Sequence, residues 1–411
     1  MNIVQINSVY GVKSTGIIVK DISMLLQERG NTSIVVSPQK TDDSTVINIG
    51  NSIDWKMHAV YTRLLGKQAL ASSGATRKLL VQLNKIKPDI IHLHNIHSNF
   101  INYKLLLQYT AENNIPVVLT LHDCWFLTGK CFHFFDIGCT KWKSGCENCP
   151  KRFKDIPSVL VDNAKTVYQL RKELYTKNKL YIVGCSQWIT EIAKESPLCV
   201  NADVRYIYNG VDTNTFTPDK GNLRGKLNID QESFVIITMA NKWFDDVNER
   251  IRNKIVNMLE EKDCLIIVGC KEEQLTVQQK KGYKGRIITM PHIKDREELA
   301  KVYNTGNVFV NLTHIDTLPT VNMEALSCSL PVITYQAGGS GELVDPGVTG
   351  YVVNDFSDDY AIIKALQNVK SGYISRQKCR EKAVSSFNKL ENYKEYLKLY
   401  EEIRNNWIEI L

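Results

Sequence analysis

Short runs of β-branched and aliphatic residues alternate with amphipathic stretches along most of the chain. In the first half the apolar runs lie at Ile3–Ile6, Ser33–Val36, Ile90–Leu93, Val117–Leu121 and Tyr181–Val183. Such nearly continuous apolar runs are typical of strands that are buried on both faces. The stretches between them include Ile17–Gln27, which precedes Gly30, and Thr76–Lys87, which precedes Pro88. Their spacing and flanking residues are those of helices, so the pattern predicts parallel strands covered by helices.

The same alternation begins again after residue 210. Residues 209–221, NGVDTNTFTPDKG, are rich in turn-forming residues and have little helical periodicity, which is typical of a linker. The second series of apolar runs lies at Phe234–Met239, Leu265–Val268, Ile287–Met290, Val308–Val310 and Val332–Thr334. Glu391–Trp407 then has apolar residues at helical spacing, namely Tyr393, Leu397, Tyr400 and Ile403.

A chain of 411 residues is too long for one ordinary core. We therefore expect an α/β protein with two doubly wound, Rossmann-like domains that face a central cleft. The first covers residues 1–208 and includes a Cys-rich loop at 124–150, and the second covers residues 209–390. A C-terminal helix in residues 391–411 is expected to pack back on the first domain.

Positive charge is concentrated in the first half of the chain. The net charge is +7, and residues 1–200 have 24 Lys and Arg against 15 Asp and Glu, with the highest density between Lys141 and Lys179. This excess is compatible with an ordinary solvated face. It is also compatible with attraction to an anionic membrane or to an acceptor that contains a diphosphate.

Ligands of open α/β sheets bind beyond the carboxyl ends of the strands, so the loops that follow strands are the candidate sites. Gly11 and Gly16 flank the first of these loops, where glycines allow backbone amides to approach a phosphate. A pair of glycines that serves only a tight turn fits equally well. His122 follows Val117–Leu121 directly and is either a residue of the cleft or a structural histidine. His94, at the end of the preceding strand, is expected to face the cleft, whereas His92 is expected to be buried.

The densest set of candidate residues lies in residues 316–342, DTLPTVNMEALSCSLPVITYQAGGSGE. Asp316 follows a predicted strand, and Glu324 falls in the second turn of a predicted helix that begins near Thr320. Carboxylates accept hydrogen bonds from the vicinal hydroxyls of sugars, and free amides at a helix start bind diphosphates. The segment therefore predicts a site for a sugar nucleotide.

This segment resembles the acidic signature of family four of the retaining GT-B glycosyltransferases, an acidic residue followed by seven others and then Glu. Asp316 stands where that family usually has its first glutamate. Residues 208–212, YNGVD, resemble the family's interdomain motif, and Leu299–Asn311 resembles the helix and strand before the acidic pair. The opening NSVYGVKSTGIIVKDI and the block LHDCWFLTGKCFHF are similar to the branch that builds colanic acid and O-antigen repeats. The resemblance covers nearly the whole chain.

The resemblance implies transfer of a sugar from a UDP- or GDP-sugar to a lipid-linked saccharide. It implies that Glu324 binds the ribose, that Asp316 binds hydroxyls of the donor sugar, and that His122 lies beside that sugar. The amides of Thr320 and Val321 would bind the diphosphate, which the loop between Gly11 and Gly16 would approach from the other domain. Such transfer needs no catalytic metal, and none is expected. The family's basic pair is incomplete here, with Lys242 as one charge and Arg250 or Arg252 as the other.

Four cysteines form a separate candidate site. Cys131, Cys139, Cys146 and Cys149 have the spacing C-x7-C-x6-C-x2-C. The final C-x2-C is the spacing of one half of a tetrahedral thiolate site, so the loop is expected to bind a structural zinc ion. A thiol-rich loop without metal, or a disulfide, is the alternative.

Other functional classes fit less well. The dinucleotide fingerprint of an NAD-dependent oxidoreductase is absent. No helix-turn-helix or zinc-finger spacing supports a nucleic-acid-binding protein, so no nucleic-acid partner is expected. A nucleic-acid- or membrane-binding protein on a degenerate GT-B scaffold remains a further alternative. No apolar stretch approaches the roughly 18 residues needed to span a bilayer, and the N-terminus lacks the features of a signal peptide. We therefore expect a cytoplasmic protein that binds peripherally to the inner face of the plasma membrane.

Overall fold

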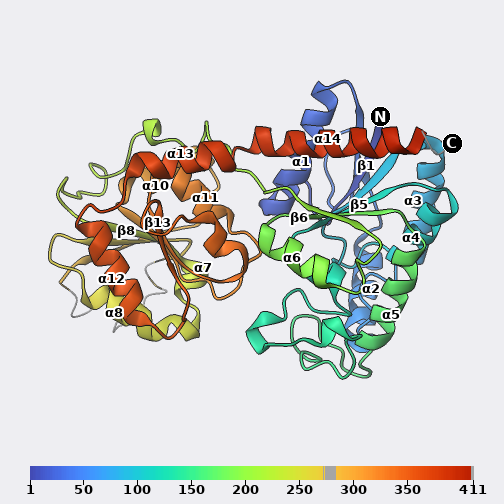
Figure 1. Cartoon of the computed structure of the whole chain (residues 1–411), viewed down its shortest axis with the longest axis horizontal. Helices are drawn as coiled ribbons and strands as arrows, with labels where there is room; N and C mark the ends of the chain where they lie inside the picture. Colours follow the sequence, from blue (N-terminus) through green and yellow to red (C-terminus); the bar gives the residue numbers. More distant parts are fainter. Residues whose placement is uncertain (272, 274–283, 409–411) are drawn as a thin grey trace. The chain divides into compact units, whose positions relative to one another are not determined.

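The computed structural model describes residues 1–271, 273 and 284–408 of the chain. Its contacts divide the chain into two compact units (Figure 1). Met1–Asn209 and the helix residues from Tyr393 onwards form the N-terminal unit, and Gly210–Asn392 forms the C-terminal unit. The boundaries expected from the sequence, after residues 208 and 390, lie one and two residues from these. Residues 409–411 of the expected last segment lie outside the described residues.

The N-terminal unit is built on a parallel sheet whose described strands have the order β3-β2-β1-β4-β5-β6-β7. These strands are β1 (Asn2–Ile6), β2 (Thr32–Ser37), β3 (Val46–Asn48), β4 (Ile90–Leu93), β5 (Val117–Leu121), β6 (Leu180–Gly184) and β7 (Asp203–Tyr206). Its helices are α1 (Lys13–Glu28), α2 (Ser52–Leu65), α3 (Ser73–Ile86), α4 (Tyr103–Glu112), α5 (Ala164–Thr176) and α6 (Gln187–Glu195). Short 3-10 turns, η1 (Trp125–Leu127), η2 (Phe135–Ile137) and η3 (Lys141–Lys143), interrupt the loop after β5. The strand order reverses beside β1, and ligands of such sheets bind outside the carboxyl ends of the strands near this point.

The C-terminal unit has a second parallel sheet, in which the described strands have the order β10-β9-β8-β11-β12-β13. These strands are β8 (Val235–Met239), β9 (Cys264–Val268), β10 (Arg286–Met290), β11 (Val308–Asn311), β12 (Val332–Tyr335) and β13 (Gly350–Val353). The helices are α7 (Ala240–Trp243), α8 (Glu249–Asn257), α10 (Arg296–Thr305), α11 (Thr320–Ser327), α12 (Asp359–Lys370), α13 (Arg376–Ser386) and the first turn of α14 (Lys389–Ile408). Further 3-10 turns are η4 (Pro218–Lys220), η5 (Asp246–Asn248) and η7 (Gly338–Leu343). Both units therefore have the doubly wound fold that the sequence predicts.

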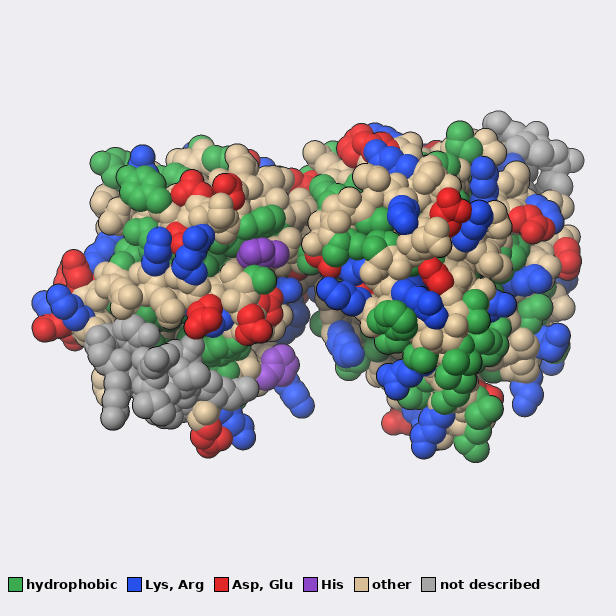
Figure 2. All heavy atoms as spheres, turned by 90° about the horizontal axis from the view of Figure 1, so that it is seen from below, with side chains coloured by type: hydrophobic (Ala, Val, Ile, Leu, Met, Phe, Trp, Pro, Cys, Tyr) green, Lys and Arg blue, Asp and Glu red, His purple; other side chains and the backbone are tan. Residues whose placement is uncertain are grey.

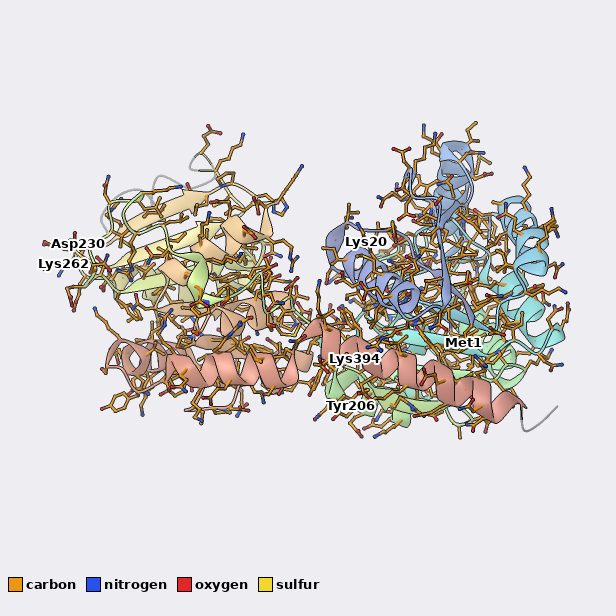
Figure 3. The ribbon with its side chains drawn as sticks, turned by 90° about the horizontal axis from the view of Figure 1, so that it is seen from above. Met1, Lys20, Tyr206, Asp230, Lys262 and Lys394 are labelled. Carbon is orange, nitrogen blue, oxygen red and sulfur yellow. The ribbon has the colours of Figure 1, made fainter. Side chains whose placement is uncertain are left out.

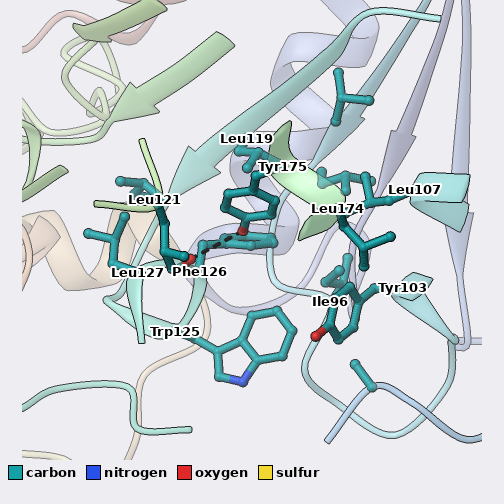
Figure 4. Packing of buried hydrophobic residues seen from close by; sticks show 14 of the residues in the cluster. Ile96, Tyr103, Leu107, Leu119, Leu121, Trp125, Phe126, Leu127, Leu174 and Tyr175 are labelled. Carbon is teal, nitrogen blue, oxygen red and sulfur yellow. Dashed lines mark hydrogen bonds between the residues drawn. The ribbon is translucent and has the colours of Figure 1, made fainter. Parts of the chain in front are cut away.

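A large apolar core fixes the loop that follows β5 in the N-terminal unit. Trp125, Phe126 and Leu127 of η1 are buried directly after the strand. Figure 4 shows Trp125 beside Tyr103, and the Tyr175 hydroxyl donates a hydrogen bond of 3.2 Å to the Phe126 carbonyl. The same cluster includes Cys131 and Cys146 of the Cys-rich loop. The polar residues between β5 and η1 are therefore held between a rigid strand and a packed core.

The part of α14 from Tyr393 onwards packs on the N-terminal unit. Tyr393, Tyr396 and Tyr400 are buried in a cluster with residues of β1, α1 and β4. Figure 3 labels Lys394 on this helix and Tyr206 at the end of β7, and an ion pair of 2.8 Å joins Arg205 of β7 to Glu402. Among the described helices, none has both the length and the apolar content required to cross a membrane.

The buried contact between α14 and β4 leads to a first prediction. The Tyr400 hydroxyl lies 2.7 Å from Nδ1 of His92, whose Nε2 lies 2.7 Å from the Thr120 hydroxyl. Tyr400→Phe keeps the packing but leaves a fully buried ring nitrogen without its partner. We expect urea unfolding to show a loss of roughly 1–3 kcal/mol. Tyr360→Phe, on an exposed position of α12, is the matched control and should change stability by less than about 0.5 kcal/mol. Equal effects of the two substitutions would contradict this role of the hydroxyl.

Candidate functional site

Two histidines and one glutamine form a hydrogen-bonded row at the carboxyl edge of the N-terminal sheet. His122, directly after β5, lies with Nε2 3.1 Å from Nδ1 of His94. Nε2 of His94 lies 3.2 Å from the side-chain oxygen of Gln5, on β1. The Gln5 amide nitrogen donates to the Val19 carbonyl at 3.3 Å, which turns the oxygen of Gln5 toward His94.

This row determines which nitrogen of His122 bears the proton. Because Gln5 accepts a hydrogen bond from His94 Nε2–H, the Nδ1 atom of a neutral His94 can only accept. His122 must then donate from Nε2, and its Nδ1 retains a lone pair. Burial lowers the pKa of His122 to about 4, with Asp123 opposing and His97 adding to the shift. His122 is therefore a neutral imidazole that can accept a hydrogen bond at Nδ1 near pH 7.

The other histidines predicted near this edge have structural contacts. His94 is fully buried, so the expectation that it faces a cleft is wrong; its ring is held between Gln5 and His122. His92 is fully buried, as expected. His97 lies 3.0 Å from the Asp123 carboxylate, whose second oxygen accepts from the Trp125 amide at 2.8 Å. These bonds fix the loop that follows His122.

The loop expected between Gly11 and Gly16 is partly helical, because α1 begins at Lys13. Gly16 lies in the first turn of this helix, and a Cβ atom there would come 3.2 Å from the backbone nitrogen of Tyr10. Gly11 has a φ of +66°, which favours glycine, and donates a hydrogen bond to the Gly16 carbonyl. The two glycines thus allow the chain to pack closely against the start of α1.

Asp316 and Glu324 flank the start of α11 in the C-terminal unit. The Asp316 carboxylate accepts a hydrogen bond of 3.1 Å from the Leu318 amide. Burial raises the pKa of Asp316 to about 6, although Lys242 and backbone amides oppose the shift. The Asp316 carbonyl accepts from the Gly339 amide at 3.0 Å, and a Cβ atom at Gly338 would lie 2.1 Å from this carbonyl oxygen. The glycine-rich turn therefore fixes the loop that presents Asp316.

The Glu324 carboxylate is almost fully buried and already has two partners. Oε1 lies 3.0 Å from Nη2 of Arg296, and Oε2 accepts from the Tyr303 hydroxyl at 3.1 Å. Burial raises the pKa of Glu324, and Arg296 and Tyr303 oppose the shift. Arg296 and Tyr303 belong to α10 and lie more than twenty residues upstream, so the acidic signature alone could not identify them.

Uncharged side chains fix the first turn of α11. Asn322 accepts a hydrogen bond from Asn311 at 2.9 Å and donates one to Ser340 at 3.1 Å, which ties α11 to β11 and η7. Pro319 precedes the helix, and no side chain caps its first turn. The predicted diphosphate amides of Thr320 and Val321 belong to this uncapped turn. Helix starts of this kind attract anions.

Lys242 lies close enough to Asp316 to affect its ionisation. Asn248 donates to the carbonyls of Lys242 and Leu312, both at 2.8 Å, and thereby joins the loops that follow β8 and β11. Arg250 pairs with Asp359 at 2.7 Å and donates to the Ser357 carbonyl. Arg252, the alternative, is buried and bonds the carbonyls of Trp243 and Asp245.

The four cysteines of the predicted zinc site line one small cavity. Its volume is about 10 Å³, and Phe134 and Trp142 form part of its wall. Cys146 has a φ of +56°, which is uncommon for this residue, and its sulfur accepts from the Gly129 amide at 3.2 Å. Burial raises the pKa of Cys131 to about 12 and that of Cys146 to about 11. Throughout the described residues, no three His, Cys, Asp or Glu side chains are arranged as they stand to hold a metal ion.

Two family models match the chain over most of its length. Residues 15–215 match "Glycosyltransferase Family 4", and residues 245–386 match "Glycosyl transferases group 1". The putative colanic acid biosynthesis glycosyl transferase WcaC of Escherichia coli K12 is 24% identical over 62% of this chain and 62% of its own length. An E. coli UDP-Gal:alpha-D-GlcNAc-diphosphoundecaprenol alpha-1,3-galactosyltransferase is 27% identical over 48% of this chain and 55% of its own. The chain thus spans less than two thirds of either relative.

Solved structures share the fold of the whole chain. A glycosyltransferase from Rickettsia africae aligns with a TM-score of 0.68 and 15% identity over 98% of both chains. HepE of Anabaena in complex with UDP-glucose aligns with a TM-score of 0.64 and 16% identity over 98% of this chain and 100% of its own. At these identities the likeness defines the fold alone.

The raised pKa of Asp316 predicts how stability depends on pH. Its folded value is about 6, against 3.8 for the free side chain, so between these values the folded protein binds a proton that the unfolded chain releases. The contribution of this group to stability therefore falls as pH rises through that window. Asp316→Asn cannot ionise, so at pH 7.5 it should be more stable than the parent by on the order of 2 kcal/mol, and nearly equal at pH 4.

Urea unfolding at both pH values measures this difference. Asp246→Asn, at an exposed position of η5, is the control and should show no difference that grows with pH. A constant offset between Asp316→Asn and the parent would contradict the desolvated carboxylate.

Proposed function

This chain belongs to the two-domain GT-B glycosyltransferases, and we propose that it is a retaining enzyme that transfers a sugar from a UDP- or GDP-sugar to a growing, lipid-linked saccharide. The product would be part of a bacterial exopolysaccharide, capsule or O-antigen. The observation on which this proposal rests is the arrangement around α11. Two carboxylates, the half-buried Asp316 and the buried Glu324, flank an uncapped helix start, with Lys242 close to Asp316.

The nature of the donor is supported by the chemistry of this arrangement. Each oxygen of Glu324 has one protein partner, and a carboxylate oxygen can accept a further hydrogen bond, here from a ribose hydroxyl. The amides of Thr320 and Val321 and the ammonium of Lys242 suit a diphosphate. Two similar proteins, a UDP-galactose-dependent transferase and HepE with bound UDP-glucose, favour UDP as the nucleotide.

Retaining transfer exchanges one bond at the anomeric carbon of the donor sugar. The bond from this carbon to the diphosphate oxygen breaks, the acceptor oxygen bonds to the same face, and the acceptor proton passes to the departing diphosphate. Asp316 would hold hydroxyls of the donor sugar. His122 would accept a hydrogen bond from a sugar hydroxyl through Nδ1, which the row of Gln5 and His94 leaves available as an acceptor. No step of this scheme requires a bound metal ion.

The similar galactosyltransferase supports the proposed acceptor. Its name specifies an acceptor linked through a diphosphate to undecaprenol, a membrane lipid. The excess positive charge of residues 1–200 suits both such a diphosphate and an anionic membrane surface. We place the enzyme at the inner face of the plasma membrane.

The proposal is tested by a donor-hydrolysis screen against UDP- and GDP-sugars, with calorimetric titration of UDP, GDP and NAD. Hydrolysis of at least one sugar nucleotide, together with binding of its free nucleotide, is the expected result. Binding of NAD alone would instead indicate an oxidoreductase. Binding of none of the three would contradict the transferase.

Glu324→Ala should weaken binding of the preferred nucleotide by about tenfold to a hundredfold, because hydrogen bonds to a charged group are each worth roughly 1.5–3 kcal/mol. Glu324→Gln should lose part of this affinity with less disturbance of the buried site. Tyr303→Phe is the control, since it removes one hydrogen bond from the same carboxylate without a ligand contact. It should lower the melting temperature but change affinity less than about threefold. A Glu324→Ala protein that melts early yet binds UDP and GDP normally would show that Glu324 is only structural.

We also propose that the Cys-rich loop binds one structural zinc ion. The four thiols line a cavity with room for about one small sphere, and zinc would draw the sulfurs inward as thiolates. Elemental analysis of protein purified without added metal should find close to one zinc per chain. Cys146→Ser with Cys149→Ser should release it, whereas Cys264→Ser with Cys270→Ser, two buried cysteines of the C-terminal unit, should not. Metal-free protein with four titrating thiols in the loop would refute the proposal.

A further inference from the structure

Helix α2 turns an apolar face toward solvent. Ile53, Met57, Val60 and Leu64 recur at the spacing of one helix face, and their exposed fractions are 70%, 67%, 55% and 39%. His58 and Thr62, on the opposite face, are buried. Surface helices of globular proteins normally have the reverse arrangement, with apolar residues toward the core.

Residues 159–161 extend this apolar face. The amides of Val159 and Leu160 donate to the carbonyls of Arg63 and Leu64 at the end of α2, each at 3.0 Å. The side chains of Val159, Leu160 and Val161 are 49%, 62% and 47% exposed. Arg152 donates to the carbonyls of Val159 and Leu160, both at 3.0 Å, and fixes the segment. We call these seven exposed apolar side chains the apolar strip: Ile53, Met57, Val60, Leu64, Val159, Leu160 and Val161.

The inner face of α2 is attached through polar contacts. Nδ1 of His58 lies 2.8 Å from the Ser72 hydroxyl, and the Thr62 hydroxyl donates to the side-chain oxygen of Asn99 at 3.1 Å. A capping box of Asn51 and Asp54 holds the first turn. If the helix rotated to bury the strip, these buried polar groups would lose their partners. The outward direction of the strip is therefore a property of the folded unit.

Basic side chains border the apolar strip. Lys56 and Arg63 of α2 are exposed beside it, and Lys154 is exposed five residues before Val159 in the sequence. The neighbouring acids are engaged, because Asp54 belongs to the capping box and Asp155 pairs with Lys151 at 2.9 Å. Figure 2 shows Lys and Arg side chains among apolar ones on the N-terminal unit. An apolar centre with a basic border is complementary to an anionic bilayer surface. A second copy of the chain would instead bring its own basic border against the first.

The same helix lines two cavities of about 310 and 360 Å³. Trp55 and Asn99 line both of them, Trp55 is half exposed, and Val60 of the apolar strip lines the second cavity. Lys56 lines the first cavity and Arg63 the second. An indole face with surrounding amide and cationic groups is suited to a saccharide that is linked to phosphate.

We propose that the apolar strip inserts into the headgroup region of an anionic lipid bilayer and that the two cavities beside Trp55 then receive the saccharide of a lipid-linked acceptor. The second half of this proposal rests on the proposed function, whereas the first half rests on the strip and its basic border alone. The strip accounts for a membrane contact that includes apolar insertion as well as the charge attraction expected from the sequence.

Co-sedimentation with vesicles tests the insertion. The full-length protein should bind vesicles of phosphatidylcholine with 30% phosphatidylglycerol at low ionic strength, and bind pure phosphatidylcholine weakly. Met57→Ser with Val60→Ser should reduce binding to the anionic vesicles at least about tenfold. Lys56→Gln with Arg63→Gln should also reduce it, and salt should weaken what remains. Val200→Ser, at a position that is 78% exposed between α6 and β7, is the matched control and should bind like the parent.

Three results would contradict the proposed insertion of the apolar strip into a bilayer. Normal vesicle binding by the Met57→Ser, Val60→Ser variant would leave attraction by charge alone. Failure of the parent to bind anionic vesicles would exclude the bilayer. A parent dimer in sedimentation analysis that this variant dissociates would identify a second copy as the occupant.

Affinity for UDP and GDP, measured on the same variants, should equal that of the parent. A parent that binds vesicles but no nucleotide would contradict the transferase and leave the insertion intact.

The cavities are tested with Trp55→Ala, which should bind vesicles within about threefold of the parent. In transfer assays with a panel of lipid-linked saccharides, its KM for the acceptor should rise at least about tenfold while hydrolysis of the donor is unchanged. An unchanged acceptor KM would overturn the assignment of the cavities.

Discussion

The desolvation of ionisable groups at the carboxyl edge of each parallel sheet is the constraint on which the candidate residues of both units depend. Within each unit, the parallel strands bring such groups to one edge of the sheet, where surrounding packing removes much of their water. Burial then opposes the charged form of each group. It raises the pKa of Asp316 and Glu324 and lowers that of His122. Acids and bases are thus moved toward neutrality by the same effect, and perturbations of this kind are concentrated at functional sites.

Most of the side chains that hold these groups are themselves uncharged. Gln5 orients the His94 ring, Asn322 ties the start of α11 to β11 and η7, and Asn248 joins the loops after β8 and β11. An amide fixes a direction without cancelling the charge that it positions. Asp316 therefore keeps an incompletely compensated carboxylate. The exception is Glu324, whose buried carboxylate is partly neutralised by the partly exposed guanidinium of Arg296.

The sequence was sufficient where packing alone determines structure. β4 and β5 have the predicted bounds because their residues are buried on both faces. β3 and β7 are short and half exposed, so they had no apolar run to reveal them. Glu324 and Asp316 followed from a motif, whereas the contact of Arg296 with Glu324 depends on how α10 packs against α11. The ion pair of Arg250 with Asp359 of α12 could not be predicted either, because it joins residues that are far apart in the sequence.

Helix α2 shows a further feature that the spacing of apolar residues cannot predict, and the structure shows the physical reason. The spacing of Ile53, Met57, Val60 and Leu64 identifies one apolar face, but periodicity does not specify which way that face points. Direction is decided by the other face, where His58 and Thr62 have buried partners that they would lose if the helix turned. A rotated helix would bury these four apolar side chains and gain the favourable free energy of removing them from water, which the observed orientation does not gain. In the isolated unit, the hydrogen bonds of the polar inner face must outweigh the unfavourable free energy of exposing these apolar side chains to water. A bilayer against the outer face would remove this unfavourable free energy. The two faces of α2 are therefore coupled, since the polar attachment that stabilises the fold also keeps the apolar surface available for lipid.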